Sequence, residues 1–474
     1  MSSLSYASLS EFFKESADVV FQRMLISKEQ LYVMTCESMI DEKMLYEVVI
    51  KTIESKKTED WGQFIQQSTL PQLQEVTTLE QAEQLLFNGF CLLLLERQQL
   101  TFAVNIANKP NRKPEETRLE VQVKGPRDNF IEHLQTNIAL VRKRLPTHSL
   151  AVKKYNVGVR SQTAVAIVYF QDIANDKLVA EIEQQIQEID TDVVISGELL
   201  MEMVNKRSFI FPRYEYSGRP DFVVQSLVRG RVGILVDGTA YAIITPVNFF
   251  LLLKSGEDAE YPAFYTSFQR FLRIIGMGFG LLLPAFWLAL TTFHQNQIPF
   301  QLLATIVLAK TGLPFPSALE MLIMILFFEL FREAGLRLPS VIGGTISVVG
   351  GLIIGDAAIS SGVTSPAMVV VIAISTIASF TLGNQSVIAT VSILRLVFII
   401  VTSFLGLYGF FLCIFVTLAY MTSIKVFGVS YLNVSTDLTL KNFIESFFRL
   451  RHQQYSKRPP MLKPKDKTRK RPKQ

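Results

Sequence analysis

The sequence predicts an α/β N-terminal region of two cytoplasmic subdomains, followed by an α-helical multi-pass membrane domain. Residues 1–270 carry charged side chains throughout, whereas residues 274–424 contain long runs with almost none. The mean hydropathy of +0.29 is high for a chain in which 19% of residues are charged, so the average conceals two unlike halves. A chain of 474 residues also exceeds one ordinary domain core.

Residues 1–110 have the pattern of a first α/β subdomain. Gln30–Cys36 is an apolar, strand-like run. Gly89–Leu95 and Leu100–Ile106 are two further apolar runs separated by a short polar stretch, which predicts a hairpin. The polar stretch Lys109–Thr117 contains two prolines and is the predicted linker to the next subdomain.

Residues 118–268 predict a second α/β subdomain. Asp128–Arg144 and Asn175–Ile189 have apolar residues at helical spacing, and Thr163–Phe170 between them is strand-like. The Asp-Gly pair at 237–238 lies between two apolar runs. This dipeptide is a strong short-range signal for a β-hairpin.

Residues 270–425 predict the membrane domain, because a bilayer-spanning helix needs about 20 mostly apolar residues. The second apolar segment is interrupted by Lys310, Gly312, Pro314 and Pro316, so it reads either as two half-helices or as a re-entrant piece. The six apolar segments are 274–293, 298–331, 341–359, 366–383, 386–403 and 405–424.

Basic residues predict the orientation of these segments, because Lys and Arg accumulate in cytoplasmic loops. Arg270, Arg332 and Lys425 fall on one side of the membrane if the second segment crosses once. The basic tail at 440–474 shares that side, which favours a cytoplasmic tail beside membrane lipid over a nucleic-acid partner. The polar stretch Met1–Val19 does not resemble a signal peptide. This distribution predicts six membrane crossings with both termini in the cytoplasm. It predicts four crossings if the second segment only dips into the membrane and another segment lies flat on its surface.

Ionisable residues inside the apolar segments are the candidate pore or gating charges: Glu320, Asp356 and Arg395. Arg395 lies about nine residues, or roughly 14 Å, into its predicted helix and therefore near mid-membrane. Because a charge on lipid costs at least ~2.5 kcal/mol, we expect Arg395 to face a carboxylate, a backbone carbonyl or a water-filled path, and Asp356 or Glu320 is the predicted carboxylate partner. A purely structural ion pair and a role in permeation or gating are both open. Glu329 and Arg332 belong to a charge ladder that predicts a solvated helix end.

Small residues recur every fourth position in the third apolar segment. Gly343, Ser347, Gly351 and Gly355 would line one face of a helix and allow a second helix to approach closely. This predicted helix-packing face indicates either a subunit or pore interface, or ordinary packing within the chain.

Motifs that carry catalysis or metal binding do not occur in the sequence. Cys36, Cys91 and Cys413 are scattered, and the four histidines form no ligand spacing. There is no Walker loop, nucleophile elbow or HExxH motif. The sequence therefore predicts a protein that is not an enzyme, with no catalytic residues, no cofactor and no metal.

Several ordered blocks of the sequence resemble the GerA family, the A subunits of spore germinant receptors, over roughly three-quarters of the chain. The blocks include Val123–Arg127 (VKGPR), Arg219–Asp221 (RPD), Gly230–Gly238 (GRVGILVDG), Glu329–Pro339 (ELFREAGLRLP) and Phe427–Leu432 (FGVSYL). The chain departs from the family pattern at Ser217-Gly218, where Thr-Glu is usual, and at Asn433-Val434, where Ala-Pro is usual.

The resemblance implies a multi-pass protein of the spore inner membrane that acts with a permease-like B subunit and a lipoprotein C subunit. It also implies a homo-oligomer with a germinant-gated pathway for monovalent cations. Two other functions are open. One is a non-conducting scaffold that organises the receptor subunits. The other is a secondary transporter, which the single broken segment supports least, because transporters of that type contain paired broken helices.

Overall fold

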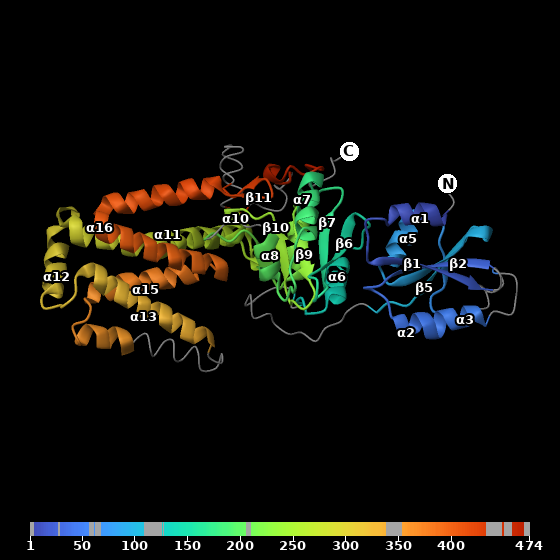
Figure 1. Cartoon of the computed structure of the whole chain (residues 1–474), viewed down its shortest axis with the longest axis horizontal. Coiled ribbons are helices and arrows are strands. Elements are labelled where there is room, and N and C mark those ends of the chain that lie inside the picture. Colours follow the sequence, from blue (N-terminus) through green and yellow to red (C-terminus); the bar gives the residue numbers. More distant parts are fainter. Residues whose placement is uncertain are drawn as a thin grey trace.

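The computed structural model describes residues 4–26, 29–55, 61, 68–108, 126, 128–204, 210–337, 353–432, 448–449 and 457–468. Three parts follow one another along the long axis of the molecule (Figure 1). The first α/β subdomain lies at one end, the second in the middle and a helical part at the other end. The predicted division into an α/β N-terminal region and a helical C-terminal part is confirmed.

The first subdomain is a five-stranded sheet in which every neighbouring pair is antiparallel. The predicted strand at 30–36 and the predicted hairpin at 89–106 are confirmed, whereas the edge strand β1 was not predicted. The strands, in sheet order, are β1 (Val19–Ile26), β2 (Glu29–Cys36), β4 (Phe90–Leu95), β5 (Leu100–Asn105) and β3 (Gln74–Glu75). The helices are α1 (Tyr6–Phe12), α2 (Glu42–Met44), η1 (Leu45–Ile50), α3 (Lys51–Glu54) and α5 (Leu79–Leu86).

The central strand β4 is apolar at every position because both faces of this sheet are covered. Leu93 and Leu95 enter a core with η1 and α3, whereas Leu92 and Leu94 enter a core with α1 and α5. Successive side chains of a strand point to opposite faces, so a strand covered on both sides loses its polar alternation. Figure 1 shows the two helical layers on opposite sides of the sheet.

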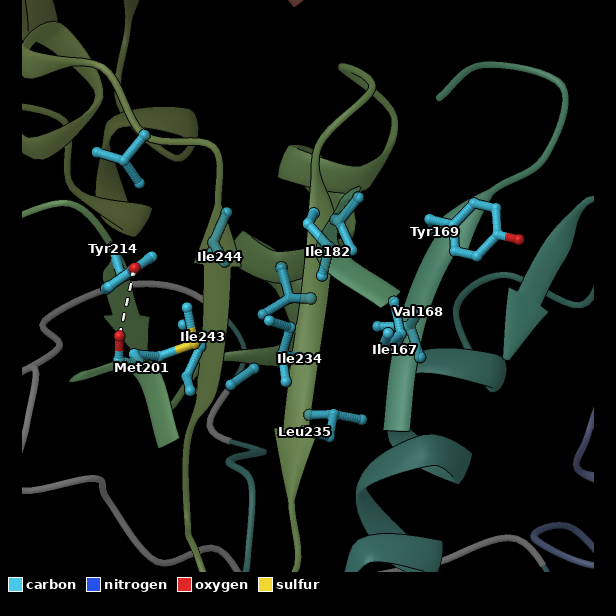
Figure 2. Packing of buried hydrophobic residues seen from close by; sticks show 14 of the residues in the cluster. Ile167, Val168, Tyr169, Ile182, Met201, Tyr214, Ile234, Leu235, Ile243 and Ile244 are labelled. Carbon is cyan, nitrogen blue, oxygen red and sulfur yellow. Dashed lines mark hydrogen bonds between the residues drawn. The ribbon is translucent and has the colours of Figure 1, made fainter. Parts of the chain in front are cut away.

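The second subdomain is another five-stranded antiparallel sheet. Figure 2 shows its core, in which Ile167, Ile234 and Ile243 come from neighbouring strands. In sheet order the strands are β6 (Leu150–Val157), β7 (Thr163–Phe170), β9 (Val232–Val236), β10 (Ala242–Thr245) and β8 (Glu215–Ser217). The helices are α6 (Leu134–Arg142), α7 (Asp176–Gln187), α8 (Gly197–Val204) and α9 (Pro220–Leu227).

The predicted hairpin at the Asp-Gly pair is confirmed, but its loop is longer than a two-residue turn. Strands β9 and β10 pair antiparallel, with Val232 opposite Thr245. Asp237 accepts a hydrogen bond from the Leu134 amide at the start of α6, and the Gly238 amide donates to the Glu132 carbonyl. Gly238 has φ +81°, a left-handed conformation that favours glycine. The loop is therefore set by its contacts with α6 as well as by the turn.

The helical part contains two helices long and apolar enough to cross a membrane, α11 and α16, among the residues that the structure describes. The break predicted near residues 310–316 is confirmed, because α12 ends at Lys310 and α13 begins at Ser317. Most of the predicted third segment, at 341–359, lies outside the described residues. The named helices are α11 (Ala263–Phe293), α12 (Phe300–Lys310), α13 (Ser317–Arg337), α15 (Pro366–Phe380) and α16 (Gln385–Ser423).

Helix α16 is a hairpin of two arms that meet at Gly406, which has φ 61° and ψ −143°. Thr390 on the first arm donates a hydrogen bond to the Ile210 carbonyl. Tyr420 on the second arm lies with its ring 5.9 Å from that of Phe211, the next residue. Both arms therefore return to the second subdomain, as Figure 1 shows. They correspond to the fifth and sixth predicted segments.

Replacing Gly406 by alanine is expected to lower the stability of the helical part by about 1–3 kcal/mol, because this backbone region is nearly restricted to glycine. A Cβ at this position would also lie 3.0 Å from the Phe293 ring. The melting temperature of the purified protein in detergent measures the effect. Gly278→Ala is the matched control, since a Cβ at Gly278 meets nothing within 4 Å. Equal melting temperatures for the two variants would contradict this role of Gly406.

Candidate functional site

The Arg395 guanidinium is buried inside the helical part, with only 2% of the residue exposed. Arg395 lies on the first arm of α16 and shares a face with Val391, Phe398, Ile399 and Thr402, which are all buried. These residues are three, four or seven positions away, the spacing that aligns side chains on one side of a helix. The sequence of α16 therefore directs this arginine toward the neighbouring helices.

The Arg395 guanidinium joins three other helices in one polar network. Its Nη2 donates to Glu329 Oε1 of α13 at 2.5 Å, and its Nη1 donates to Ser375 Oγ of α15 at 3.2 Å. Ser375 Oγ in turn donates to the Gly280 carbonyl of α11 at 2.9 Å. The Arg395 Nε atom has no hydrogen-bond partner within the described ranges. Helices α11, α13, α15 and α16 are thus coupled through one side chain.

Arg332 completes the network from the next turn of α13. Its Nη2 forms an ion pair with Glu329 Oε2, and its Nη1 donates to Ser392 Oγ on α16 at 2.9 Å. Glu329 therefore lies between two arginines, each paired with a different carboxylate oxygen. Charge-assisted hydrogen bonds of this kind are about twice as strong as neutral ones.

The predicted partners of Arg395 were wrong, because the carboxylate that meets it is Glu329 rather than Glu320 or Asp356. Nine residues separate the two glutamates of α13, or about 14 Å along a helix, so only one of them reaches the level of Arg395. Asp356 lies exposed in the helix at 353–360. The prediction that Glu329 and Arg332 form only a solvated helix end was also wrong, since both bind α16 residues.

Glu320 is buried and binds the N-terminal end of α15. The residue is 1% exposed, and its Oε1 accepts hydrogen bonds from Thr364 Oγ1, Ser365 Oγ and the Ser365 amide. Ser365 is the N-cap residue of α15. A carboxylate at a helix N-terminus satisfies unpaired amides and interacts favourably with the helix dipole. Glu320 therefore fixes α13 against the start of α15.

Close packing of α11 against α15 depends on Gly276 and Gly280, which lie outside the predicted helix-packing face. A Cβ at Gly276 would collide with Thr381, and one at Gly280 would collide with Ser379. The four-residue spacing of these glycines in an apolar run is the small-xxx-small signal for close helix approach. Of the predicted small-residue face, Gly343, Ser347 and Gly351 lie outside the described residues. A Cβ at Gly355 would make an ordinary 3.7 Å contact with Val369.

This polar network can hold the helices in one arrangement, and it offers charged groups to any ion or water that enters between them. No group of three or more His, Cys, Asp or Glu side chains that could hold a metal occurs in the described part of the chain. Removing one partner of a buried ion pair of this type strongly destabilises a protein, because the other charge stays buried without a counter-charge.

Comparisons with known proteins give a consistent result. The family described as "Bacillus/Clostridium GerA spore germination protein" matches residues 7–461. The chain is 42% identical to "Spore germination protein XA" of Bacillus anthracis over 403 residues, covering 84% of this chain and 82% of that protein. It is 32% identical to "Spore germination protein KA" of Bacillus subtilis (strain 168), covering 96% and 85%.

A solved structure is also similar to part of the chain. It is the N-terminal domain of the A subunit of the Bacillus megaterium spore germinant receptor GerK3. Sequence identity is 23% and the TM-score is 0.39, with 51% of this chain and 93% of that chain covered.

Proposed function

The chain belongs to the GerA family of spore germination proteins, and from this premise we propose that it is the A subunit of a spore germinant receptor. In this proposal the protein crosses the spore inner membrane several times and assembles as a homo-oligomer. It acts with a permease-like B subunit and a lipoprotein C subunit. The nutrient signal received by the complex changes the packing of its helices and opens a path for monovalent cations.

The observation that carries the conducting role is the network of Arg395, Glu329 and Arg332 among the mostly apolar helices. Ionisable residues at membrane depth are costly and typically mark ion paths, gates or paired structural charges. Because this network couples four helices, a shift of any one helix changes the hydrogen bonds of Arg395. Glu320 and Asp356 are further charges that we propose to act on ion preference.

Exposed aromatic and aliphatic side chains on the helices support the membrane location. Phe279, Phe404 and Phe415 are each about half exposed or more. Lipid tails or neighbouring subunits would cover such residues, since a soluble protein rarely leaves a large apolar surface in water. The basic residues near the second subdomain, such as Arg270 and Lys425, favour a cytoplasmic position for that side.

Arg395→Ala is expected to alter monovalent-cation flux through the purified protein in liposomes, because it removes the charge that links α16 to α13 and α15. The oligomeric state is determined on the same preparation, so that loss of assembly is not mistaken for loss of conduction. Arg160→Ala, which removes an exposed arginine of the second subdomain, is the control and should leave flux unchanged.

A well-assembled oligomer that conducts no ions, with or without its partner subunits and a germinant, would favour the scaffold function instead. In that case, substitutions in the network should change assembly with the partner subunits, and neither the wild-type protein nor the variants should conduct ions. The scaffold function is compatible with the geometry, because the network also fixes the helices of one chain against one another.

A further inference from the structure

A cavity of 340 Å³ lies where the second subdomain meets the helical part. Residues of the second subdomain and of the helical part line it together. Lys254, Ser255 and Gly256 follow the short helix α10 (Phe249–Leu252), Arg273 lies in the first half of α11, and residues 381–386 form the connection from α15 and the first turn of α16. If α15 and α16 lie in the bilayer, this connection places the cavity at the level of the membrane surface.

Lys254 is the cavity-lining cation that no acidic group neutralises directly. Among the described residues, no hydrogen bond or ion pair reaches its amine, although it is only partly exposed. Burial and the nearby Arg270, Arg229 and Arg231 hold the pKa of Lys254 well below its usual range. Asp258 is the acidic residue that opposes this effect.

Asp258 is already engaged by two arginines of α11. Its Oδ2 accepts from Arg270 Nε at 2.7 Å, and its Oδ1 accepts from Arg273 Nη1 at 2.9 Å. One carboxylate is therefore shared between two guanidinium groups. Positive charge around Lys254 exceeds what Asp258 compensates.

Two buried guanidinium groups next to Lys254 also keep an unused donor. Arg231 Nη1 and Arg270 Nη1 have no hydrogen-bond partner within the part of the chain that the structure describes. Arg231 donates through its other nitrogens to the Pro246 carbonyl and to Asn248 Oδ1. Burial, together with the charge of Arg229, lowers the pKa of Arg231 to about 9. Buried donors without a partner, close to an amine without a partner, indicate that a bound anion would be stabilised here.

The two carboxylates of the cavity each bind another residue of its lining, and the charge of Glu215 offsets part of the effect of burial on the pKa of Arg231. Glu215 accepts hydrogen bonds from Asn384 Nδ2 at 2.9 and 3.0 Å. Glu198 forms a hydrogen bond with Tyr216. Neither carboxylate pairs with Lys254 among the described residues, so its amine is open to an anion in the cavity.

We propose that this cavity binds a phosphate group beside Lys254, supplied either by the headgroup of an anionic phospholipid or by a soluble phosphate. This inference goes beyond the proposed function and does not depend on whether the helices conduct ions. A lysine amine binds phosphate as a point charge. The unused donors of Arg231 and Arg270 nearby favour an anion with several acceptor oxygens. An occupied site would tie the second subdomain to the connection between α15 and α16.

The test measures binding of two probes to the full-length protein purified in detergent. Native mass spectrometry compares retention of phosphatidylglycerol with that of phosphatidylcholine, and calorimetry measures binding of inorganic phosphate. Lys254→Met is expected to weaken binding of the preferred probe about tenfold, the range for a charge-assisted hydrogen bond. Lys254→Arg, which keeps the charge, is expected to retain most of the binding.

Lys425→Met is the matched control, because Lys425 is exposed and follows the second arm of α16. Retention of phosphatidylglycerol without binding of inorganic phosphate identifies a lipid site, and the reverse identifies a soluble ligand. Wild-type affinity of Lys254→Met for both probes would overturn the proposal. An equal loss in Lys425→Met would overturn it too, since it would indicate general attraction of anions to a basic surface. The melting temperature of Lys254→Met is not expected to fall, because no described residue forms a hydrogen bond or ion pair with the Lys254 amine that the substitution would break.

Discussion

Replacing Asp18 by asparagine is expected to lower the free energy of unfolding by about 3–5 kcal/mol, the range for breaking a buried ion pair by removing one partner. Asp18 and Arg142 are both fully buried and form a two-bond pair, with distances of 2.7 and 2.9 Å. Arg142 also donates to the carbonyls of Thr147 and Leu150. The variant leaves the guanidinium buried beside a neutral amide.

The Asp18–Arg142 pair joins the two α/β subdomains, because Asp18 precedes β1 and Arg142 ends α6. We therefore expect loss of Asp18 to separate the subdomains before the rest of the protein unfolds. Limited proteolysis and denaturant unfolding of the full-length protein measure this. Glu11→Gln is the control, since its pair with Lys14 is exposed and such pairs contribute at most about 1 kcal/mol. Equal stability of the two variants would show that the buried pair does not hold the subdomains together.

Replacing Glu329 by leucine is expected to reduce the amount of folded protein in membranes severely, with a loss of about 3–5 kcal/mol, because it leaves Arg395 buried without a counter-charge. Glu329 is the carboxylate that contacts both Arg395 and Arg332. The melting temperature and the yield of monodisperse protein in detergent measure the effect.

The double variant Glu329→Leu with Arg395→Met separates the structural role of the pair from a conducting role. Replacing both members of a buried ion pair by apolar residues of similar volume is often neutral for stability. We therefore expect the double variant to recover stability relative to Glu329→Leu. If it does, its cation flux in liposomes shows directly whether the charges matter for conduction. A double variant as unstable as the single one would contradict the pairing seen between α13 and α16.

Some elements followed from the sequence because their signals are local. The strand at 30–36 and the hairpin at 89–106 are short apolar runs bounded by polar residues, and they form β2, β4 and β5. The break between α12 and α13 followed from Pro314 and Pro316, since proline disrupts helical hydrogen bonding. Family membership followed from ordered blocks of residues, and the comparisons confirm it.

Other features had no local signal. Strand β1 was not predicted because Gln22 and Arg23 interrupt its apolar residues, which is compatible with an edge strand whose middle is partly exposed. A break near residue 404 was predicted from the length of the apolar run, but nothing identified Gly406 as the residue at which α16 reverses, since glycine is common in membrane helices. The cavity beside Lys254 is lined by segments more than 100 residues apart, so no spacing in the sequence could indicate it.

The division into a charged α/β region and an apolar helical part, the main apolar segments and the family could be predicted from the order of the amino acids. These properties depend on composition and on residue order over short stretches. The contacts of Arg395 with Glu329, of Glu320 with the start of α15 and of Asp18 with Arg142 became visible in the folded chain alone. Such contacts depend on the relative height and rotation of separate elements. Packing sets those two quantities, and a spacing along the chain does not record them.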